Sequence, residues 1–240
     1  MLDGDRISSL VAAFISELFD DAGIDKSVIN IGVVQTAYAN GASTDYLKDR
    51  LRLPVTCTPT GVKYLHHAAA KYDVGVYFEA NGHGTVLFSA DALSTFRNQP
   101  PQSPAQKLAL DTLVAVSNLI NQTVGDAISD LLLVELVLAY KDWTLKEWSQ
   151  TYTDLPNRLA RVEVHDKDAF HTVDAERKLS HPEGAQNAID RCVEKYARAR
   201  AFARASGTEN ACRVYAEAAS RHEAEELCAK VVEVVRKFGN

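Results

Sequence analysis

Helical and extended segments alternate along the first part of the chain, and this alternation constrains the fold more than any other feature. Apolar residues recur at helical spacing between residues 10 and 18 and predict a first helix, which Gly23 ends. Strands that alternate with helices form mostly parallel sheets with helices on their faces. The later segments, in chain order, are a strand at 29–34, a short helix, a strand at 54–57, a helix after Gly61 and a strand at 74–78.

The order of segments changes in the last third of the chain. Two helices, predicted over 105–124 and 126–140, close the first part. Strands gathered beside helices are typical of a small α+β domain. We predict strands at 158–164, 199–205 and 211–216 and helices at 182–196 and 220–237. The fold class is therefore α/β: a mixed, mostly parallel, helix-flanked sheet domain over 1–140, a linker over 141–157, and a smaller α+β domain over 158–240.

Charge separates these two parts and excludes one class of function. The chain carries 32 acidic and 26 basic side chains, a net charge of −6, whereas a general nucleic-acid binder needs a surplus of Lys and Arg. Residues 1–150 hold 17 acidic and 11 basic side chains, and residues 151–240 hold 15 of each. Between Arg191 and Arg213 lie six basic residues against two acidic ones, which is enough to attract one small anion.

Hydropathy and cysteine usage point to a cytoplasmic protein. The most apolar segment, 131–140, is shorter than the run of about 18 residues that spans a bilayer, and Glu135 interrupts it, so we expect no membrane contact. The acidic start lacks the basic region of a signal peptide. No Cys-x-x-Cys spacing occurs, and each cysteine lies in an apolar or helical context, which favours reduced core residues over a disulfide framework. The four cysteines are Cys57, Cys192, Cys212 and Cys228.

A Ser-Gly-Thr turn between the last two predicted strands is the strongest candidate for an anion site. Ser206 and Thr208 offer hydroxyl groups, and Gly207 allows a close approach to the backbone N–H groups. Arg204 before the turn and Arg213 after it would add charge-assisted hydrogen bonds to a phosphate. The alternative is a tight hairpin with arginines on its surface.

A second candidate is the loop Glu-Ala-Asn-Gly-His-Gly at 79–84, which follows an apolar strand. Glu79 and Asn81 are two residues apart, so in an extended segment both side chains point to one side. A carboxylate beside an amide suits the neighbouring hydroxyl groups of a sugar. The alternative is a glycine-rich hairpin in which His83 lies on the surface.

A third candidate is the strand-to-helix junction Thr-Gly-Val-Lys at 60–63, a place where ligands bind in α/β sheets. Lys63 falls in the first turn of the helix, where the helix dipole disfavours a cation. A lysine at such a position is a candidate general acid/base. A solvated surface lysine is the alternative. His66 and His67 point about 100 degrees apart on a helix and cannot share one metal ion; we expect one to pack and the other to face solvent.

The segment Asp3-Gly4-Asp5-Arg6 invites a metal-site interpretation. Two carboxylates are too few for a hard cation without further ligands. Acidic residues also suit the first turn of a helix. A helix start is therefore the preferred interpretation.

Taken together and in this order, these segments resemble the C-terminal half of the phosphoacetylglucosamine mutases, eukaryotic members of the α-D-phosphohexomutase superfamily. The matching strings are GVVQTAYANGAST at 32–44, TGVK at 60–63, EANGHG at 79–84, SGTE at 206–209 and RVYAE at 213–217. The resemblance covers essentially the whole chain and implies the third domain of four over about 1–140 and the fourth, TBP-like domain over about 150–240.

The resemblance also implies roles for individual residues. Glu79 and Asn81 would bind sugar hydroxyl groups with His83 close by, and Lys63 is the candidate general acid/base. The substrate contacts would include Gly61 and Val62. The substrate's phosphate would be held by Arg204, Ser206, Gly207, Thr208 and Arg213.

The family reaction interconverts N-acetylglucosamine 6-phosphate and N-acetylglucosamine 1-phosphate on the route to UDP-N-acetylglucosamine. It uses a phosphoserine, Mg²⁺ and a bisphosphorylated sugar intermediate. The family's serine loop and its Asp-Gly-Asp-x-Asp-Arg magnesium loop have no counterpart here, since residues 2–6 match the segment that opens the third domain instead. A chain without nucleophile or cation is expected to be inactive alone.

Three interpretations stay open at this point. The chain is a part of a phosphoacetylglucosamine mutase that recognises N-acetylglucosamine phosphate, or a non-catalytic sugar-phosphate-binding or interaction module. In the third interpretation, another polypeptide supplies the missing N-terminal domains.

Overall fold

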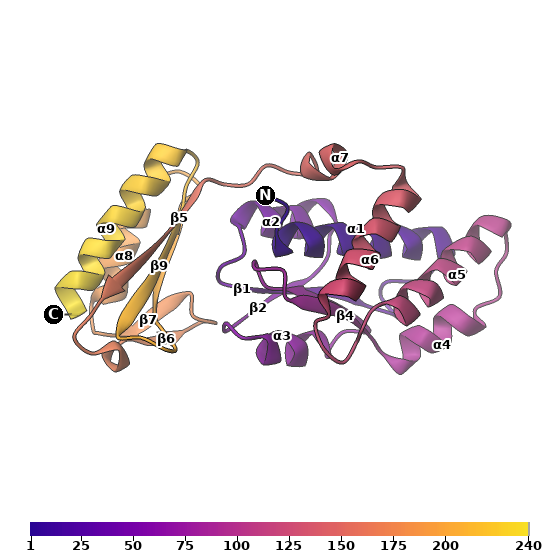
Figure 1. Ribbon diagram of the computed structural model, residues 1–240, viewed down its shortest axis with the longest axis horizontal. Coiled ribbons are helices and arrows are strands. Elements are labelled where there is room, and N and C mark those ends of the chain that lie inside the picture. The colour runs from indigo at the N-terminus through magenta and orange to yellow at the C-terminus, as the bar shows by residue number, and fades with distance from the viewer. Residues whose placement is uncertain (240) are drawn as a thin grey trace. The chain divides into compact units, whose positions relative to one another are not determined.

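The computed structural model describes residues 1–239, and the chain divides into two compact units (Figure 1). Met1–Thr153 forms the first unit, and the second begins at Asp154. Each unit has its own hydrophobic core.

A four-stranded sheet forms the centre of the first unit. Its strands are β1 (Ile31–Thr36), β2 (Val55–Thr58), β3 (Val74–Phe78) and β4 (Gly84–Phe88), in the order β2-β1-β3-β4. β1 pairs in parallel with β2 and β3, and β4 pairs antiparallel with β3. This confirms the prediction of a mixed, mostly parallel sheet.

Helices cover both faces of this sheet, so every residue of β1 and β3 is buried. Tyr77 packs on the α3 side with Leu65, whereas Val76 packs with Phe14 of α1 in the main core. The helices are α1 (Gly4–Ala22), α2 (Gly41–Asp45), α3 (Val62–Ala69), α4 (Ala90–Asn98), α5 (Pro104–Leu119), α6 (Ala127–Lys141) and α7 (Leu145–Ser149), with a π-helical turn at Tyr46–Arg50.

The first helix has the predicted ends. The Asp3 side chain accepts a hydrogen bond from the N–H of Arg6, and Gly23 at the other end adopts a left-handed conformation. The predicted helix 105–124 is too long, because α5 ends at Leu119. There the Asn121 side chain accepts hydrogen bonds from the N–H groups of Thr123 and Val124, and this local turn competes with the helix. Helix α4 was not predicted.

The segment predicted as a linker, 141–157, is partly folded into the first unit. It contains α7, whose start is a capping box between Thr144 and Glu147. Trp148 of this helix is buried in the main core, and its indole N–H donates to the carbonyl of Arg6 at 3.2 Å.

The second unit is a small α+β fold, as the sequence predicts. A three-stranded antiparallel sheet has the order β5-β9-β8, and α8 and α9 pack on one of its faces. A two-stranded hairpin, β6 with β7, was not predicted. The elements are β5 (Asn157–Glu163), a 3-10 turn (Lys167–Ala169), β6 (His171–Val173), β7 (Lys178–His181), α8 (Ala185–Val193), β8 (Arg200–Ala205), β9 (Ala211–Glu217) and α9 (Arg221–Gly239).

The four cysteines were predicted to be core residues, and this holds for Cys212 and Cys228, whereas Cys57 and Cys192 are only half-buried. Cys212 and Cys228 are buried in the core of the second unit, and burial raises the pKa of both thiols. In the described residues, no helix is both long and apolar enough to cross a membrane.

Candidate functional site

The Ser-Gly-Thr segment forms an open turn between β8 and β9, here called the anion turn (residues 206–210). Ser206 is buried, and its N–H donates to the carbonyl of Ala211 at 2.7 Å, which closes the base of the turn. The N–H of Thr208 lies 3.5 Å from the Ser206 hydroxyl oxygen, at the limit of a hydrogen bond. Among residues 1–239, no acceptor lies within hydrogen-bond reach of the N–H groups of Gly207 or Glu209. The turn therefore offers donors to a ligand.

Gly207 has no internal reason to be a glycine. A Cβ atom built at this position meets nothing within 4 Å, and the backbone φ is not positive. A side chain there would cost the fold nothing, but it would stand beside the open N–H groups. The absence of a side chain at Gly207 therefore matters only to a ligand that binds at the turn.

Three arginines form a row across the sheet beside the anion turn. In the strand register, Arg213 of β9 lies opposite Arg161 of β5 on one side and opposite Arg204 of β8 on the other. Like charges at directly opposed positions destabilise a sheet. Such a row is unfavourable for the fold and suits the binding of an anion. Arg161 was not among the predicted site residues.

Carboxylates balance this row in the structure. Glu209 binds Arg161 at 2.7 Å and Arg213 at 3.3 Å, and its hydrogen bond from Arg161 lowers the pKa of Glu209. Glu176, in the β6–β7 turn, lies 3.6 Å from Nε of Arg204. The positive charge counted between residues 191 and 213 is thus partly neutralised by Glu176, which lies outside that segment.

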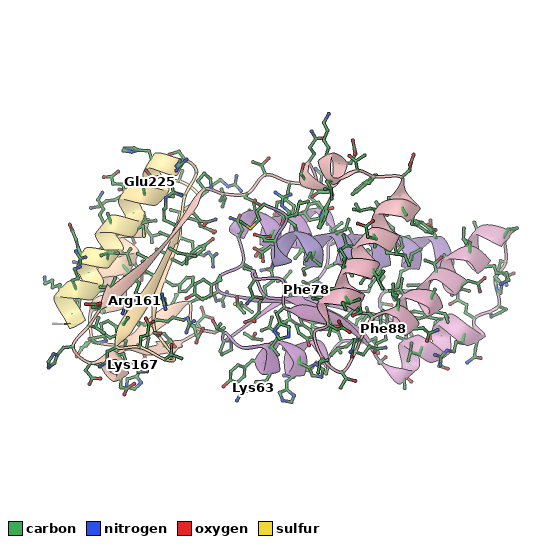
Figure 2. All side chains as sticks on the ribbon, viewed as in Figure 1. Lys63, Phe78, Phe88, Arg161, Lys167 and Glu225 are labelled. Carbon is green, nitrogen blue, oxygen red and sulfur yellow. The ribbon has the colours of Figure 1, made fainter. Side chains whose placement is uncertain are left out.

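One cation at the anion turn interacts with the backbone alone. The ammonium group of Lys167 donates to the carbonyl oxygens of Ser206 at 3.1 Å and Gly207 at 3.3 Å. Within the described part of the chain, no carboxylate lies at ion-pair distance from it. Figure 2 places Lys167 and Arg161 in the same unit. The sequence analysis missed Lys167, because no local pattern links it to the turn.

In the first unit, residues 79–84 form the tight turn between β3 and β4, here called the sugar hairpin. The N–H of Glu79 donates to the carbonyl of His83 at 2.9 Å, and the N–H of His83 donates to the Asn81 side chain at 2.8 Å. The Asn81 amide lies 3.5 Å from the Glu79 carboxylate. The predicted neighbours Glu79 and Asn81 are thus adjacent, and the hairpin interpretation of this loop is also correct.

The start of α1 supports the sugar hairpin from beneath. The N–H of Gly4 donates to the carbonyl of Ala80 at 3.2 Å. A Cβ atom at Gly4 would lie only 1.8 Å from the carbonyl oxygen of Glu79, so no larger residue fits without moving one of the two segments. The conformation of the hairpin depends on this close contact.

Residues of both predicted segments of the first unit, 60–63 and 79–84, line a pocket of about 300 Å³. Val62 and Lys63 of α3 line it together with His83 of the sugar hairpin. Gly61 precedes them as the residue before the helix, while Glu79 and Asn81 are not part of the lining. The remaining lining residues are His66, His67, Tyr77, Thr123, Val124 and Gly125. We call this space the histidine pocket.

Lys63 is exposed in the first turn of α3 (Figure 2). Its ammonium group lies 4.9 Å from the centre of the Tyr64 ring. No side chain caps this helix start, so the N–H groups of Val62 and Lys63 remain available to an anion. The structure therefore places Lys63 at the mouth of a pocket, where a ligand can reach it.

Tyr77 orients one histidine of the pocket. Its hydroxyl oxygen lies 3.0 Å from Nδ1 of His66, and burial together with the nearby Asp130 raises the pKa of Tyr77. A phenol that keeps its proton can donate to Nδ1, which places the imidazole proton on Nε2. His67 is exposed, so one histidine packs and the other faces solvent, as predicted.

The residues of this chain do not fit a magnesium site. Asp3 caps α1, and Asp5 is buried and accepts the N–H of Asn40 at 2.8 Å. A search of residues 1–239 finds no group of three or more His, Cys, Asp or Glu side chains that could hold a metal ion. The interpretation of residues 3–6 as a helix start is confirmed.

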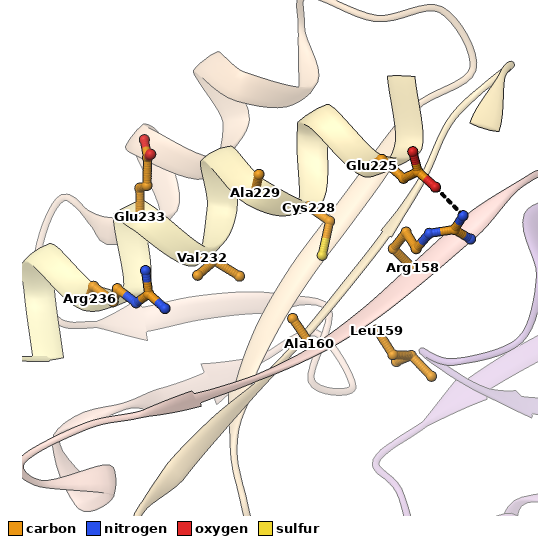
Figure 3. A pocket seen from close by; sticks show the side chains of 9 residues that line it. All are labelled: Arg158, Leu159, Ala160, Glu225, Cys228, Ala229, Val232, Glu233 and Arg236. Carbon is orange, nitrogen blue, oxygen red and sulfur yellow. Dashed lines mark hydrogen bonds and ion pairs between the residues drawn. The ribbon is translucent and has the colours of Figure 1, made fainter. Parts of the chain in front are cut away.

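A second pocket, of about 350 Å³, lies between β5 and α9 and contains none of the candidate residues (Figure 3). An ion pair between Arg158 and Glu225 crosses from the strand to the helix at its edge. Burial raises the pKa of its cysteine, Cys228. Because the candidate residues all lie outside its lining, this pocket is not the candidate site.

Comparison with known families matches both units. Residues 159–234 match the C-terminal domain of the phosphoglucomutase/phosphomannomutase family, so the second unit belongs to this class of domain. Residues 3–143 match domain III of phosphoacetylglucosamine mutase. The chain belongs to the phosphoacetylglucosamine mutase family.

Individual relatives agree with this assignment. Phosphoacetylglucosamine mutase 2 of Schizosaccharomyces pombe is 54% identical over 98% of this chain, which spans 43% of that relative. The crystal structure of Aspergillus fumigatus N-acetylphosphoglucosamine mutase with GlcNAc-6P and magnesium is 61% identical over 98% of this chain and 47% of its own, with a TM-score of 0.96. A variant of that enzyme in complex with glucose 1,6-bisphosphate is 60% identical over 100% of this chain and 44% of its own, with a TM-score of 0.95. The chain thus spans less than half the length of these relatives.

Proposed function

We propose that this chain provides the sugar- and phosphate-recognition part of a phosphoacetylglucosamine mutase. The observation that carries the proposal is the anion turn, where open N–H groups, two hydroxyl groups and a row of arginines meet. A monoester dianion needs several convergent donors, and this turn supplies them. Residues 1–140 would then act as the sugar-binding domain and residues 158–240 as the phosphate-binding domain.

Each predicted residue takes a role in this proposal. Ser206, Gly207 and Thr208 bind the phosphate through hydroxyl and N–H groups, and Arg204 and Arg213 exchange their carboxylate partners for the ligand. Because those arginines are held by Glu176 and Glu209 in the structure, phosphate competes with an internal anion for them. Breaking these arginine–carboxylate ion pairs offsets part of the binding free energy that the phosphate contributes.

The sugar is recognised in the first unit. Glu79 and Asn81 accept and donate hydrogen bonds to neighbouring hydroxyl groups, with His83 beside them. Gly61, Val62 and Lys63 contact the substrate from the start of α3. Lys63 is our candidate for general acid/base catalysis, and its place at the mouth of the histidine pocket supports this role.

The reaction proposed for the whole enzyme interconverts N-acetylglucosamine 6-phosphate and 1-phosphate through a bisphosphorylated sugar. Support comes from the relative crystallised with GlcNAc-6P and magnesium and from its variant with glucose 1,6-bisphosphate. Two orientations of one sugar bisphosphate would require a fixed phosphate anchor and a sugar site that tolerates both. The anion turn and the sugar hairpin suit these two tasks.

This chain alone is expected to bind substrate without turning it over. It carries neither the serine loop nor the magnesium loop of the family, and phosphoryl transfer depends on positioning and charge stabilisation by a metal ion. Preceding domains of the same polypeptide or of another would supply both. We further propose a cytoplasmic location, with N-acetylglucosamine phosphate as the main partner.

Titration calorimetry tests the sugar part of this proposal. We expect Glu79→Gln to weaken the binding of N-acetylglucosamine 6-phosphate to the chain about tenfold and to leave the binding of inorganic phosphate unchanged, because Glu79 would contact only the sugar. A matched control is Glu135→Gln, which changes an exposed glutamate of α6 outside the hairpin. Equal loss for both ligands would contradict the assigned role.

A further inference from the structure

We infer that Lys167 is a positioning residue of the anion turn: its ammonium group holds two successive carbonyl groups on one side and thereby directs the N–H groups of Gly207 and Thr208 to the other. This inference rests on the proposed phosphate site. It adds a residue that acts through the backbone of the turn and makes no contact with the ligand.

The first step is the contact itself. Nζ of Lys167 lies 3.1 Å from the carbonyl oxygen of Ser206 and 3.3 Å from that of Gly207. One donor group thus binds two consecutive peptide units. Lys167 is partly buried in the short 3-10 turn after β5, and Asp166 caps this turn by accepting the N–H of Asp168 at 2.9 Å.

The second step follows from peptide geometry. A trans peptide is planar, and its C=O and N–H bonds point in opposite directions. The carbonyl of Ser206 shares a peptide with the N–H of Gly207, and the carbonyl of Gly207 shares one with the N–H of Thr208. Because Lys167 holds both carbonyl groups, both N–H groups face away from it. Two successive N–H groups on one side form an anion-binding nest.

The third step concerns the side chains of the turn. The hydroxyl oxygen of Ser206 lies 3.5 Å from the N–H of Thr208, so it stands on the side to which the N–H groups point. The open space around Gly207 leaves that side accessible. The donors for one anion therefore gather opposite Lys167.

The fourth step is the charge balance. Arg161, Arg204 and Arg213 each have a carboxylate partner, and Lys167 has none within residues 1–239. Its charge binds the negative ends of two peptide dipoles, whose positive N–H ends face the proposed anion. A cation behind the turn therefore fixes the two peptide planes in the orientation that attracts an anion.

The test compares Lys167→Met, Lys167→Arg and a control, Lys178→Met, in the full chain. Lys178 is an exposed residue of β7, so the control removes the same charge from the same unit without touching the turn. Backbone ¹⁵N order parameters of the ligand-free proteins and titration with inorganic phosphate are measured together. Thermal melting verifies that each variant is folded.

We expect Lys167→Met to lower the ¹⁵N order parameters of Gly207 and Thr208 and to weaken phosphate binding about tenfold, whereas Lys167→Arg and Lys178→Met keep the order parameters and an affinity within about twofold of the original chain. Unchanged order parameters at both amides overturn the inference, even when affinity falls, because Lys167 would then be a direct charge contact. If the original chain binds no phosphate, the proposed function fails, while the order parameters still decide whether Lys167 orders the turn. A folded Lys167→Arg chain with the same loss of order as Lys167→Met also overturns the inference.

Discussion

The sugar hairpin and the anion turn are both short connections between antiparallel strands, but they are held in different ways. The sugar hairpin bonds most of its own N–H groups: that of Glu79 donates to the carbonyl of His83, that of Gly82 to the carbonyl of Glu79, and that of His83 to the Asn81 side chain. The anion turn leaves N–H groups open, and a distant side chain, Lys167, binds its carbonyl groups. In the function that we propose, the site for neutral hydroxyl groups uses side chains on a largely self-bonded backbone, whereas the site for a phosphate uses backbone N–H groups.

The largest expected effect is steric and separates two glycines, one at each loop. Gly4→Ala would place a Cβ atom 1.8 Å from the carbonyl oxygen of Glu79, whereas Gly207→Ala meets open space. We expect Gly4→Ala to lower the free energy of unfolding by about 3 kcal/mol or more and Gly207→Ala to change it by less than about 0.5 kcal/mol. Urea denaturation measures both.

Gly207→Ala also distinguishes an effect on folding from an effect on ligand binding. Gly207→Ala is expected to weaken phosphate binding about tenfold, because its methyl group stands beside the open N–H groups. A destabilised Gly207→Ala chain would show that the glycine serves the fold, and undiminished affinity would show that the ligand binds elsewhere.

The second prediction contrasts how carboxyl groups in the two units respond to pH. Asp130 of the first unit is buried, one of its oxygens has no hydrogen-bond partner among the described residues, and burial, aided by Asp126, raises its pKa to about 7. The pKa of Asp130 is thus higher in the folded state than its unfolded value of 3.8. As regards this group, the protein has its full stability below about pH 3.8 and loses part of it as pH rises towards 7, because ionising the buried carboxyl group costs free energy. In the second unit, ion pairs lower the pKa of Glu209 and Glu225, so their contribution is lost as pH falls.

Asp130→Asn tests this contrast. At pH 8 we expect the free energy of unfolding of the variant to exceed that of the original chain by on the order of 2–4 kcal/mol. This difference should shrink steadily towards pH 4. Urea denaturation across this pH range measures it. A difference that does not depend on pH would mean that the Asp130 carboxyl keeps its ordinary pKa in the fold.

The third prediction concerns the arginine row. Arg204→Ala removes a charge-assisted donor, and we expect it to weaken the binding of N-acetylglucosamine 6-phosphate by roughly 1.5–3 kcal/mol, or about ten- to hundredfold. Calorimetric titration gives the dissociation constant, and Arg177→Ala, an exposed arginine in the β6–β7 turn, is the control. An unchanged dissociation constant for the Arg204→Ala variant would mean that Arg204 only pairs with Glu176 and does not bind the ligand.

Local sequence predicted the candidate loops because each is a contiguous segment with a chemical pattern. The Ser-Gly-Thr turn and the Glu-x-Asn pair need no knowledge of distant residues, and the first helix is bounded by Asp3 and Gly23 as its caps predict. The end of α5 at Leu119 was missed although Asn121 carried a local signal, the tendency of its side chain to bond nearby N–H groups.

The missed site residues depend on contacts that local patterns do not contain. Arg161 joins the site only because β5 pairs antiparallel with β9, which places it opposite Arg213. Lys167 joins it through the turn that follows β5. Strand register and helix packing, which bring these residues together, follow from the whole fold.

The central claim, that the chain recognises a sugar phosphate without converting it, can be tested in one experiment. Titration calorimetry of the isolated chain with N-acetylglucosamine 6-phosphate, in a solution with Mg²⁺, is followed by ³¹P NMR of the same sample. The account predicts saturable binding that is tighter than that of inorganic phosphate, with no N-acetylglucosamine 1-phosphate formed. Absence of binding by a folded chain would contradict the recognition role, and formation of the 1-phosphate would contradict the need for the missing domains.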